Sequence, residues 1–293
     1  MSRNQTQDAQ ILYDDRAATY DDSWHPRFAR QMVQLVNIKP GEHVLDLACG
    51  TGLVSYLAGV AVGTSGTVTG VDISSGMLAQ AKAKKSTHSA PNVEFHHHSI
   101  TNLNSLSAVQ SKQFDVVVCA SALVLLEYPA AALKQWATYL KKGGRLIVDV
   151  THPESQSANI TFERTGRRLG KPVPSYRVPF QKADDLRDMM EDAGHRNVGV
   201  KLISQLRVRD ATDDVDAYIC DHRKPQLENI FDVTDAESMF EKGMGHHFTE
   251  SVATSDVRQQ AKAIFIEEWT KLADSYGYVN EVDGVFVGLG TKL

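Results

Sequence analysis

The chain has 293 residues, of which 42% are hydrophobic, 8% aromatic and 23% charged, an ordinary globular composition that excludes disordered, collagen-like and disulfide-rich classes. Its 31 basic and 36 acidic residues give a formal net charge of −5, so the chain lacks the basic footprint of a nucleic-acid binder, and a small-molecule partner is favoured. The length fits one large α/β domain with additions, or two domains.

The cysteines and the N-terminus indicate the compartment. Cys49, Cys119 and Cys220 form no spaced framework, which is typical of a reduced intracellular protein. Residues 1–8 are polar and precede no apolar stretch, and the apolar run 116–126 is too short to span a bilayer. We therefore expect a cytoplasmic protein with no nucleic-acid or membrane partner, and the sequence predicts no oligomeric state.

Residues 40–150 alternate β-branched runs with helix-like stretches, and this rhythm predicts βαβ units. The runs are nearly continuously apolar at their centres, as parallel strands covered on both faces should be. Ser74 is placed to cap a helix over 76–85, Pro129 suits the first turn of a helix over 130–142, and Gly143-Gly144 should end that helix. The predicted strands are 43–47, 67–73, 92–97, 114–120 and 145–150.

The rhythm breaks after residue 150. Residues 151–180 contain four prolines and little periodicity, so we interpret them as an inserted loop. A helix over 181–193, stopped by Gly194, a strand over 197–206 and a last strand over 285–289 complete the pattern. The sequence thus predicts an α/β fold with a doubly wound, mostly parallel, seven-stranded Rossmann-like sheet and helical cap insertions.

The polar stretch 207–283 contains one clear amphipathic helix. Its apolar residues recur at helical spacing, and we expect this helix to pack on the ligand edge of the sheet. These residues are Val257, Ala261, Ile264, Phe265, Trp269 and Leu272.

The strongest chemical signal is the string Val-Leu-Asp-Leu-Ala-Cys-Gly-Thr-Gly at 44–52, where a strand enters a glycine turn that opens a helix. Gly50 and Gly52 remove side chains that would block the close approach of a ligand. Asp72 ends the second strand, where a carboxylate can accept both hydroxyls of a ribose. A structural turn would carry the same glycines, so Asp72 is the observation that favours an adenosine-type ligand.

Two positions argue against a dinucleotide. Ser55 stands where such a site needs glycine or alanine for tight helix packing. Asp46 would repel a pyrophosphate but would hold an ammonium group. We therefore expect the ligand to carry a cation.

These residues resemble the class I S-adenosylmethionine-dependent methyltransferases, whose first motif reads D-x-x-x-G-x-G and whose second strand ends in an acidic residue. The resemblance covers roughly 13–206 and implies that S-adenosyl-L-methionine is the cofactor and S-adenosyl-L-homocysteine its product. Ser99 departs from the family, which places an acidic residue there for the adenine amine. The cofactor-binding residues that the resemblance implies are Tyr20, Asp46, Ala48, Cys49, Gly50, Gly52, Asp72, Ile73, Met77, Ser99, Ile100, Cys119 and Ser121.

The run 114–123 looks like the family's fourth motif. Related enzymes often follow it with a His-His pair, but this chain has Val124-Leu125, so no general base is evident there. We assign no catalytic residue and expect transfer to depend on proximity and orientation. Cys49 and Cys119 are interpreted as small buried fillers rather than nucleophiles, because neither has a charged neighbour in sequence.

The remaining candidates are aromatic and histidine residues. Tyr20 matches the tyrosine of an A-x-x-Y-D string in the quinone-biosynthesis branch of the family. His96-His97-His98 predict no metal site, because adjacent strand residues point to opposite faces. For Tyr13 and Trp24 a packing role is an alternative, as is a surface turn for the two cap histidines. The residues predicted for the substrate pocket are Tyr13, Trp24, Leu123, His246 and His247.

We divide the chain into lid helices at 1–39, an S-adenosylmethionine-binding core at 40–206, a helical substrate cap at 207–283 and the last core strand at 284–293. Whole strings, especially 13–24, 44–54, 71–80 and 120–126, resemble the fungal gliotoxin bis-thiomethyltransferases of secondary metabolism and detoxification.

That resemblance implies a small-molecule thiol substrate, a reduced dithiol diketopiperazine such as dithiol gliotoxin, whose two thiols are methylated in turn. A thiol with a pKa of about 8.5 supplies some thiolate at neutral pH, so it needs less help from a base than a hydroxyl does. The alternatives are an O-methyltransferase with a base in the cap, a dinucleotide oxidoreductase, and a cofactor-binding regulator without chemistry.

Overall fold

The computed structural model describes residues 5–88, 90–171, 173–207, 214–220 and 227–293. Residues 208–213 and 221–226 of the predicted cap lie outside the described residues. Within the described part, no helix is both long enough and apolar enough to cross a membrane.

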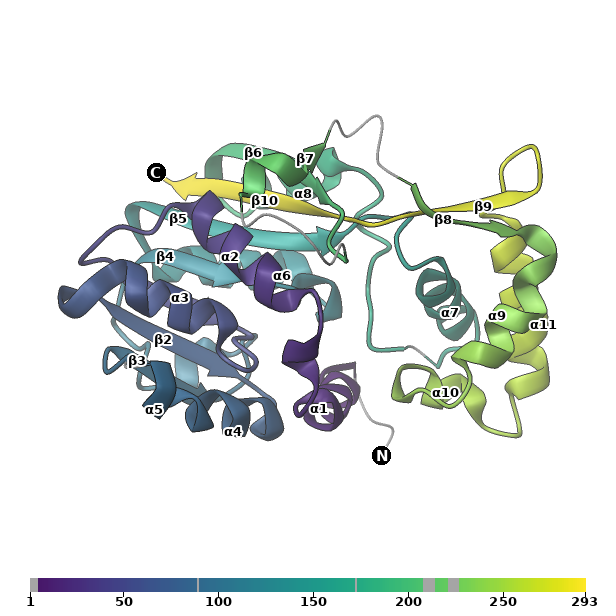
Figure 1. Ribbon diagram of the computed structural model, residues 1–293, viewed down its shortest axis with the longest axis horizontal. Coiled ribbons are helices and arrows are strands. Elements are labelled where there is room, and N and C mark those ends of the chain that lie inside the picture. The colour runs from purple at the N-terminus through teal and green to yellow at the C-terminus, as the bar shows by residue number, and fades with distance from the viewer. Residues whose placement is uncertain (1–4, 89, 172, 208–213, 221–226) are drawn as a thin grey trace.

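An eight-stranded sheet forms the centre of the core, in the order β3-β2-β1-β4-β5-β10-β6-β7 (Figure 1). Strands β1 to β5 pair in parallel, and β10 runs antiparallel between β5 and β6. The predicted strands are therefore confirmed, and the edge strand β7 is an addition. The strands are β1 (His43–Leu47), β2 (Thr67–Asp72), β3 (Val93–His97), β4 (Phe114–Cys119), β5 (Leu140–Thr151), β6 (His195–Ser204), β7 (Ile219–Cys220) and β10 (Gly284–Lys292).

Helices cover both faces of this sheet because its strands are apolar on both sides. Leu45 of β1 packs into the hydrophobic core shared with α6 and α8, and its neighbour Val44 packs into the core shared with α2 and α3. Ser74 caps α4 as predicted, since its Oγ accepts from the backbone N–H of Met77 at 3.0 Å. The helices of this part are α1 (Gln5–Arg16), α2 (His25–Val36), α3 (Leu53–Val62), α4 (Ser75–Ala83), α5 (Lys85–His88), α6 (Pro129–Tyr139) and α8 (Ala183–Asp192).

The prediction that Gly143-Gly144 end the helix after Pro129 was wrong. Helix α6 ends at Tyr139, and Leu140 already has extended backbone angles. Leu140 is fully buried and pairs with Phe114 of β4, so packing draws the chain into the sheet before the glycines are reached.

A separate lobe, which we call the cap lobe, stands beside the sheet and has its own hydrophobic core (Figure 1). The interpretation of 151–180 as a loop was wrong, because these residues contain α7, and Phe162 of α7 is buried against Phe240 and Phe265. The predicted amphipathic helix is confirmed as α11, but it packs on α7 and α9 rather than on the ligand edge of the sheet. The lobe consists of α7 (Ser157–Arg168), β8 (Leu227–Asp232), α9 (Ala236–Gly243), α10 (Glu250–Ala253), α11 (Arg258–Thr270) and β9 (Tyr278–Val282).

Candidate active site

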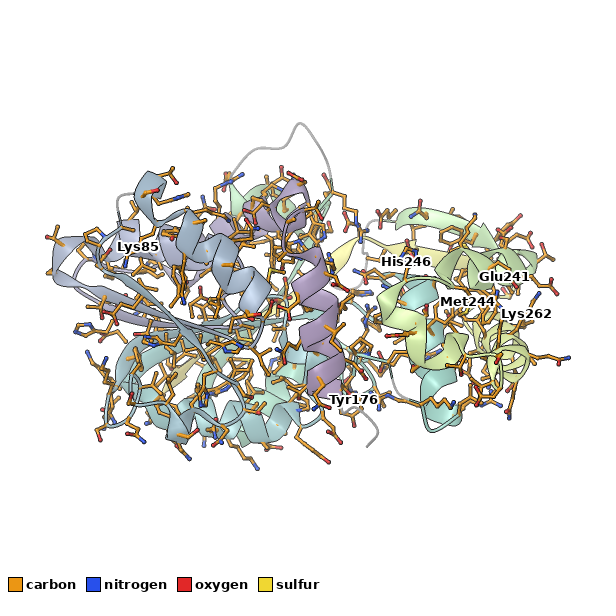
Figure 2. All side chains as sticks on the ribbon, turned by 90° about the horizontal axis from the view of Figure 1, so that it is seen from below. Lys85, Tyr176, Glu241, Met244, His246 and Lys262 are labelled. Carbon is orange, nitrogen blue, oxygen red and sulfur yellow. The ribbon has the colours of Figure 1, made fainter. Side chains whose placement is uncertain are left out.

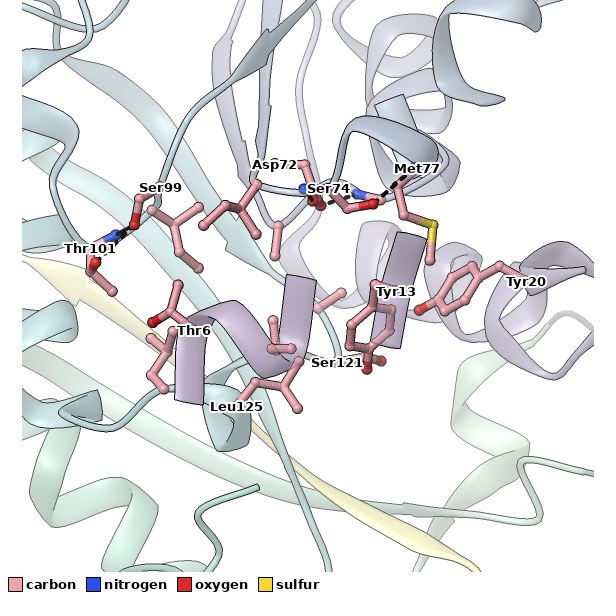
Figure 3. Close-up of a pocket in the computed structure, with 18 residues that line it drawn as sticks. Thr6, Tyr13, Tyr20, Asp72, Ser74, Met77, Ser99, Thr101, Ser121 and Leu125 are labelled. Carbon is pink, nitrogen blue, oxygen red and sulfur yellow. Dashed lines mark hydrogen bonds between the residues drawn. The ribbon is translucent and has the colours of Figure 1, made fainter. Parts of the chain in front are cut away.

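A cavity lies at the carboxyl ends of β1, β2 and β4 beneath α1, and we call it the lid cavity (Figure 3). It holds about 700 Å³ of space, part of which is open to solvent. Thr6, Ala9 and Tyr13 of α1 form its lid side. The residues predicted for the cofactor that line it are Tyr20, Ala48, Gly50, Asp72, Ile73, Met77, Ser99, Ile100 and Ser121.

Asp72 is the fixed carboxylate of the lid cavity. Its Oδ2 accepts from the backbone N–H of Gly50 and its Oδ1 from that of Ser74, both at 2.7 Å. Burial raises the pKa of Asp72, while the backbone N–H donors act to lower it. Each oxygen keeps a lone pair that can accept a further hydroxyl, which is the chemistry needed to hold a ribose.

The two glycines of the first motif serve different purposes. A Cβ on Gly50 would meet no atom within 4 Å, so it would project into open space at the cavity. A Cβ on Gly52 would lie 2.9 Å from the ring of Phe95 and 3.0 Å from that of Tyr56. Gly50 therefore leaves room for a ligand, whereas Gly52 allows the N-terminus of α3 to pack closely.

Some residues predicted for the cofactor do not reach the lid cavity. Asp46 is buried and its Oδ2 accepts from the Ser55 hydroxyl at 2.5 Å, and burial raises its pKa to about 7. Asp46 and Cys49 line a smaller adjoining cavity, which Gly50 also borders. Cys119 is fully buried, because strand alternation turns its side chain into the core on the α6 side.

Two carboxylates fasten the N-terminal segment over the lid cavity. Asp14 of α1 accepts from the Ser74 hydroxyl at 2.6 Å and from the backbone N–H of Gly76 at 2.8 Å. Asp21 accepts from the Thr51 hydroxyl at 2.5 Å and pairs with Lys84. The rings of Tyr13 and Tyr20 are thereby held at the cavity (Figure 3).

A second and larger cavity, which we call the cap cavity, adjoins the first and holds about 1170 Å³ of space, part of it open to solvent. It lies between the N-terminal segment, the carboxyl end of β5, the first residues of β10 and the cap lobe. Tyr13, Ser121 and Leu125 line both cavities, so the two meet at these residues. The charged side chains of its wall are Arg16, Asp149, Arg177, Arg207 and Asp283.

Only some of the residues predicted for the substrate pocket line the cap cavity. Tyr13 and Trp24 line the cap cavity. Leu123 is fully buried in the core and so does not reach it. His246 is exposed on the cap lobe and lines neither of these cavities (Figure 2), and the side chain of His247 lies outside the described residues. Phe248 of the same turn lines the cap cavity instead.

His25 is a buried aromatic residue that lines the cap cavity and the smaller cavity beside Asp46. Its ring lies 4.2 Å from that of Tyr20 and is stacked 4.1 Å from that of Trp24, and its Nδ1 pairs with the Ser23 hydroxyl at 2.6 Å. Burial, with the charge of Arg16, lowers the pKa of His25 to about 3. The imidazole is therefore neutral near pH 7 and too weak a base to retain a proton.

Sequence reasoning missed Asp149, which lies near the end of β5. Its Oδ1 accepts from the backbone N–H of Ser121 at 2.6 Å, and its side chain lines the cap cavity. Burial raises its pKa to about 7. The available signal was a carboxylate inside the apolar string Leu-Ile-Val-Asp-Val at 146–150, at the same end of the sheet as Asp72.

The histidine run on β3 shows no shared ligand. His96 lies 3.7 Å from Glu94, His97 bonds the carbonyl of Ile73 and His98 pairs with the Ser105 hydroxyl. In the described part of the chain, no three His, Cys, Asp or Glu side chains gather closely enough to hold a metal ion.

The chain is similar to known methyltransferases. A profile of the methyltransferase domain family matches residues 38–193. The chain is 26% identical over 195 residues to a demethylmenaquinone methyltransferase of Alkalihalophilus pseudofirmus, which covers 61% of this chain and 81% of that protein. It is 28% identical over 153 residues to the aklanonic acid methyltransferase DauC of a Streptomyces species, and this match covers 51% of this chain and 67% of that protein.

The fold is shared with solved structures. A cyclopropane-fatty-acyl-phospholipid synthase-like protein of Lactobacillus casei superposes with a TM-score of 0.54 at 19% identity, covering 92% of this chain and 91% of that one. The α/β architecture with a mostly parallel sheet is therefore confirmed, with eight strands rather than seven.

Proposed function

This chain belongs to the methyltransferase domain family and uses S-adenosylmethionine, and from that premise we propose that it methylates a small metabolite bound in the cap cavity. The observation that supports this most directly is that the two cavities meet at Tyr13, Ser121 and Leu125. A donor in the lid cavity and an acceptor in the cap cavity would then face each other across a short boundary.

The lid cavity has the residue types that S-adenosylmethionine needs. Gly50 leaves open space beside the strand, Asp72 offers fixed carboxylate oxygens for the ribose, and the apolar side chains of Ile73 and Met77 suit the faces of an adenine. Bound there, the cofactor would supply an electrophilic methyl group on a positively charged sulfur. Tyr13 and Tyr20 would exclude water from it.

We propose a thiol as the acceptor group. The side chains that border both cavities are a tyrosine, a serine and a leucine, and none of these is a strong base at neutral pH. A thiol is partly ionised near pH 7 and is intrinsically nucleophilic, so a weak base such as a carboxylate on the cavity wall is sufficient to accept its proton. The polar and charged wall of the cap cavity would suit the amide groups of a reduced dithiol diketopiperazine, whose two thiols would be methylated in turn.

A second candidate is methylation of an oxygen or carbon on an aromatic metabolite. The two curated relatives are named for demethylmenaquinone and aklanonic acid, not for a thiol. Trp24 and Tyr13 on the wall of the cap cavity would stack on an aromatic ring.

A panel assay with methyl-labelled S-adenosylmethionine separates these candidates. The acceptors are dithiothreitol, a reduced dithiol diketopiperazine, a naphthoquinol, an aromatic polyketide acid and a primary amine. We expect label in the diketopiperazine, first as a monothioether and then as a dithioether. Label in the quinol or the polyketide, with none in either thiol, would refute the thiol and favour the second candidate.

A further inference from the structure

We propose that Asp149 is the catalytic residue that takes the proton from the acceptor during methyl transfer. The inference rests on the proposed function, because it assigns a proton acceptor to the boundary between the same two cavities. Nothing in the sequence motifs singles out this residue, since the expected position for a base is occupied by Val124-Leu125.

The position of Asp149 carries the argument. It lies near the carboxyl end of β5, is only 3% exposed, and is one of the residues that line the cap cavity. Its Oδ1 is held at 2.6 Å by the backbone N–H of Ser121, a residue that lines both cavities. The carboxylate is therefore anchored beside the boundary where an acceptor atom must lie to reach a donor.

The backbone at this point is fixed in an unusual conformation. Ser121 follows β4 with φ at +58°, in the left-handed region that non-glycine residues rarely adopt. This conformation aims its N–H at Asp149. The same strand-end residue thus shapes the lid cavity and orients the carboxylate of the cap cavity.

The charge environment suits a proton acceptor. Within the described chain, no lysine, arginine or histidine forms an ion pair with Asp149, so burial outweighs the backbone N–H donors that favour the charged form and raises the pKa of the carboxyl to about 7. The facing ionisable groups, the thiol of Cys119 on β4 and the hydroxyls of Tyr13 and Tyr20, have pKa values raised by burial. They stay neutral near pH 7. The other ionisable residues on the wall of the cap cavity are Arg16, Arg177, Arg207, His25 and Asp283, and none of them is among the causes of the pKa shift of Asp149.

The proposed step balances without a further reactant. The S–H bond of the acceptor breaks, its proton goes to a carboxylate oxygen of Asp149, and its electron pair forms the new bond from sulfur to the methyl carbon. The bond between the methyl carbon and the donor's sulfur breaks, and its electron pair stays on the sulfur of the demethylated donor. The proton then leaves Asp149 for water in the cap cavity.

The test uses Asp149→Asn, which keeps an oxygen to accept from Ser121 but cannot take up a proton. We expect turnover near pH 7 to fall at least tenfold, because a base is removed and only a few per cent of a thiol with a pKa of about 8.5 is ionised at that pH. S-adenosylhomocysteine affinity, measured by calorimetry, should change less than threefold. The deficit should shrink as the pH is raised past the acceptor's own titration, because the substrate then arrives already deprotonated.

A second measurement needs neither cofactor nor acceptor. Because the pKa of Asp149 is raised in the folded chain, the folded state holds a proton between about pH 4 and pH 7 that the unfolded state releases. Stability from this proton is full below pH 4 and is lost as the pH rises through 7. As the pH rises from 5 to 8, the urea midpoint of the parent should therefore fall relative to that of Asp149→Asn.

Asp115→Asn is the matched control. Asp115 lies on the neighbouring strand β4 but at the opposite end of the sheet, where it pairs with Lys141 and accepts from the backbone N–H of His43. This variant should lose some stability and keep its turnover.

Three results would each overturn the proposal: more than a tenth of parental turnover in Asp149→Asn, a deficit that is equal at every pH, or a stability difference that does not change with pH. Methylation of the quinol instead of the thiols would refute only the thiol acceptor, and the Asp149 test would then use the quinol.

Discussion

The two motif glycines offer a sharp test of the site, because the same substitution should have opposite consequences at each. At Gly50, alanine would adopt φ near +54°, a left-handed conformation that the chain already tolerates at Ala48 with φ +54°. The strain of about 1 kcal/mol is partly offset by the lower entropy of the unfolded chain. The new methyl would meet no protein atom within 4 Å, so the folded state should remain close to parental stability.

At Gly52, alanine would combine φ near +82° with a Cβ at 2.9 Å from the Phe95 ring and 3.0 Å from the Tyr56 ring. Overpacking of this kind costs about 1–3 kcal/mol, and left-handed strain adds about 1–2 kcal/mol. Gly52→Ala should therefore be less stable than the parent by about 2–5 kcal/mol. The overlap lies on the α3 side, away from the lid cavity.

Urea unfolding and calorimetry with S-adenosylhomocysteine measure the two effects separately. We expect Gly50→Ala to unfold near the parental midpoint and to bind at least tenfold more weakly, a loss of about 1.4 kcal/mol. Gly52→Ala should unfold early and, where folded, bind within about threefold of the parent. Parental affinity in Gly50→Ala would refute the assignment of the lid cavity to the cofactor, and equal stability of the two variants would refute the packing argument.

Two further predictions concern buried titratable groups. Asp72→Ala should weaken S-adenosylhomocysteine binding about tenfold or more, because it removes a buried acceptor worth about 1–3 kcal/mol; unchanged affinity in a folded variant would contradict the ribose assignment. His195 is fully buried, neither of its ring nitrogens has a hydrogen-bond partner among the described residues, and burial lowers its pKa to about 4. As the pH falls from 6.5 to 4, the unfolded state takes up a proton that the folded state does not, so stability should fall. In urea unfolding of His195→Leu, the free energy of unfolding should fall less between pH 6.5 and pH 4 than it does in the parent. An equal fall would show that other groups cause the loss of stability.

The core of the fold was predictable because each of its signals is local and agrees with its neighbours. A parallel strand buried on both faces is continuously apolar, and the run 114–120 needs no distant information to be identified as β4. The capping hydroxyl of Ser74 and the stop at Gly194 are likewise decided within a few residues. The motif glycines and Asp72 then follow from a strand-to-helix turn of known chemistry.

The cap lobe was harder to predict because its helix α7 depends on distant contacts. Its sequence, Ser-Ala-Asn-Ile-Thr-Phe-Glu-Arg-Thr-Gly-Arg-Arg, is rich in weak helix formers. Inside the fold, the Thr161 and Thr165 hydroxyls each bond a carbonyl four residues back, at 2.7 and 2.8 Å. Phe162 gains its buried contacts from α9 and α11, which come some eighty to a hundred residues later. Local propensity therefore favoured a loop where tertiary packing makes a helix.

Side-chain direction at the predicted site residues was hard to predict for a similar reason. Motif spacing identifies the strand end on which Asp46 or Cys119 lies, but it does not decide which of two buried directions a side chain takes. In Asp46 the hydroxyl of Ser55 provides a partner inside the protein, so the carboxylate turns away from the lid cavity. Leu123 likewise lies in the fourth-motif region and packs inward, while Leu125 two residues later reaches both cavities.

Asp46, Asp72 and Asp149 all lie at or near the carboxyl ends of buried strands, yet each has different hydrogen-bond partners. Asp72 has two anchoring backbone N–H donors, which favour its charged form against the desolvation that all three share. For Asp149 the backbone N–H of Ser121 favours the charged form in the same way, but burial outweighs it and raises the pKa to about 7, so this carboxyl can exchange a proton near neutrality. A carboxylate that binds hydroxyls should stay charged, whereas one that accepts a proton should titrate near the working pH. The different partners of these carboxylates thus support the proposed division between cofactor binding at β2 and proton transfer at β5.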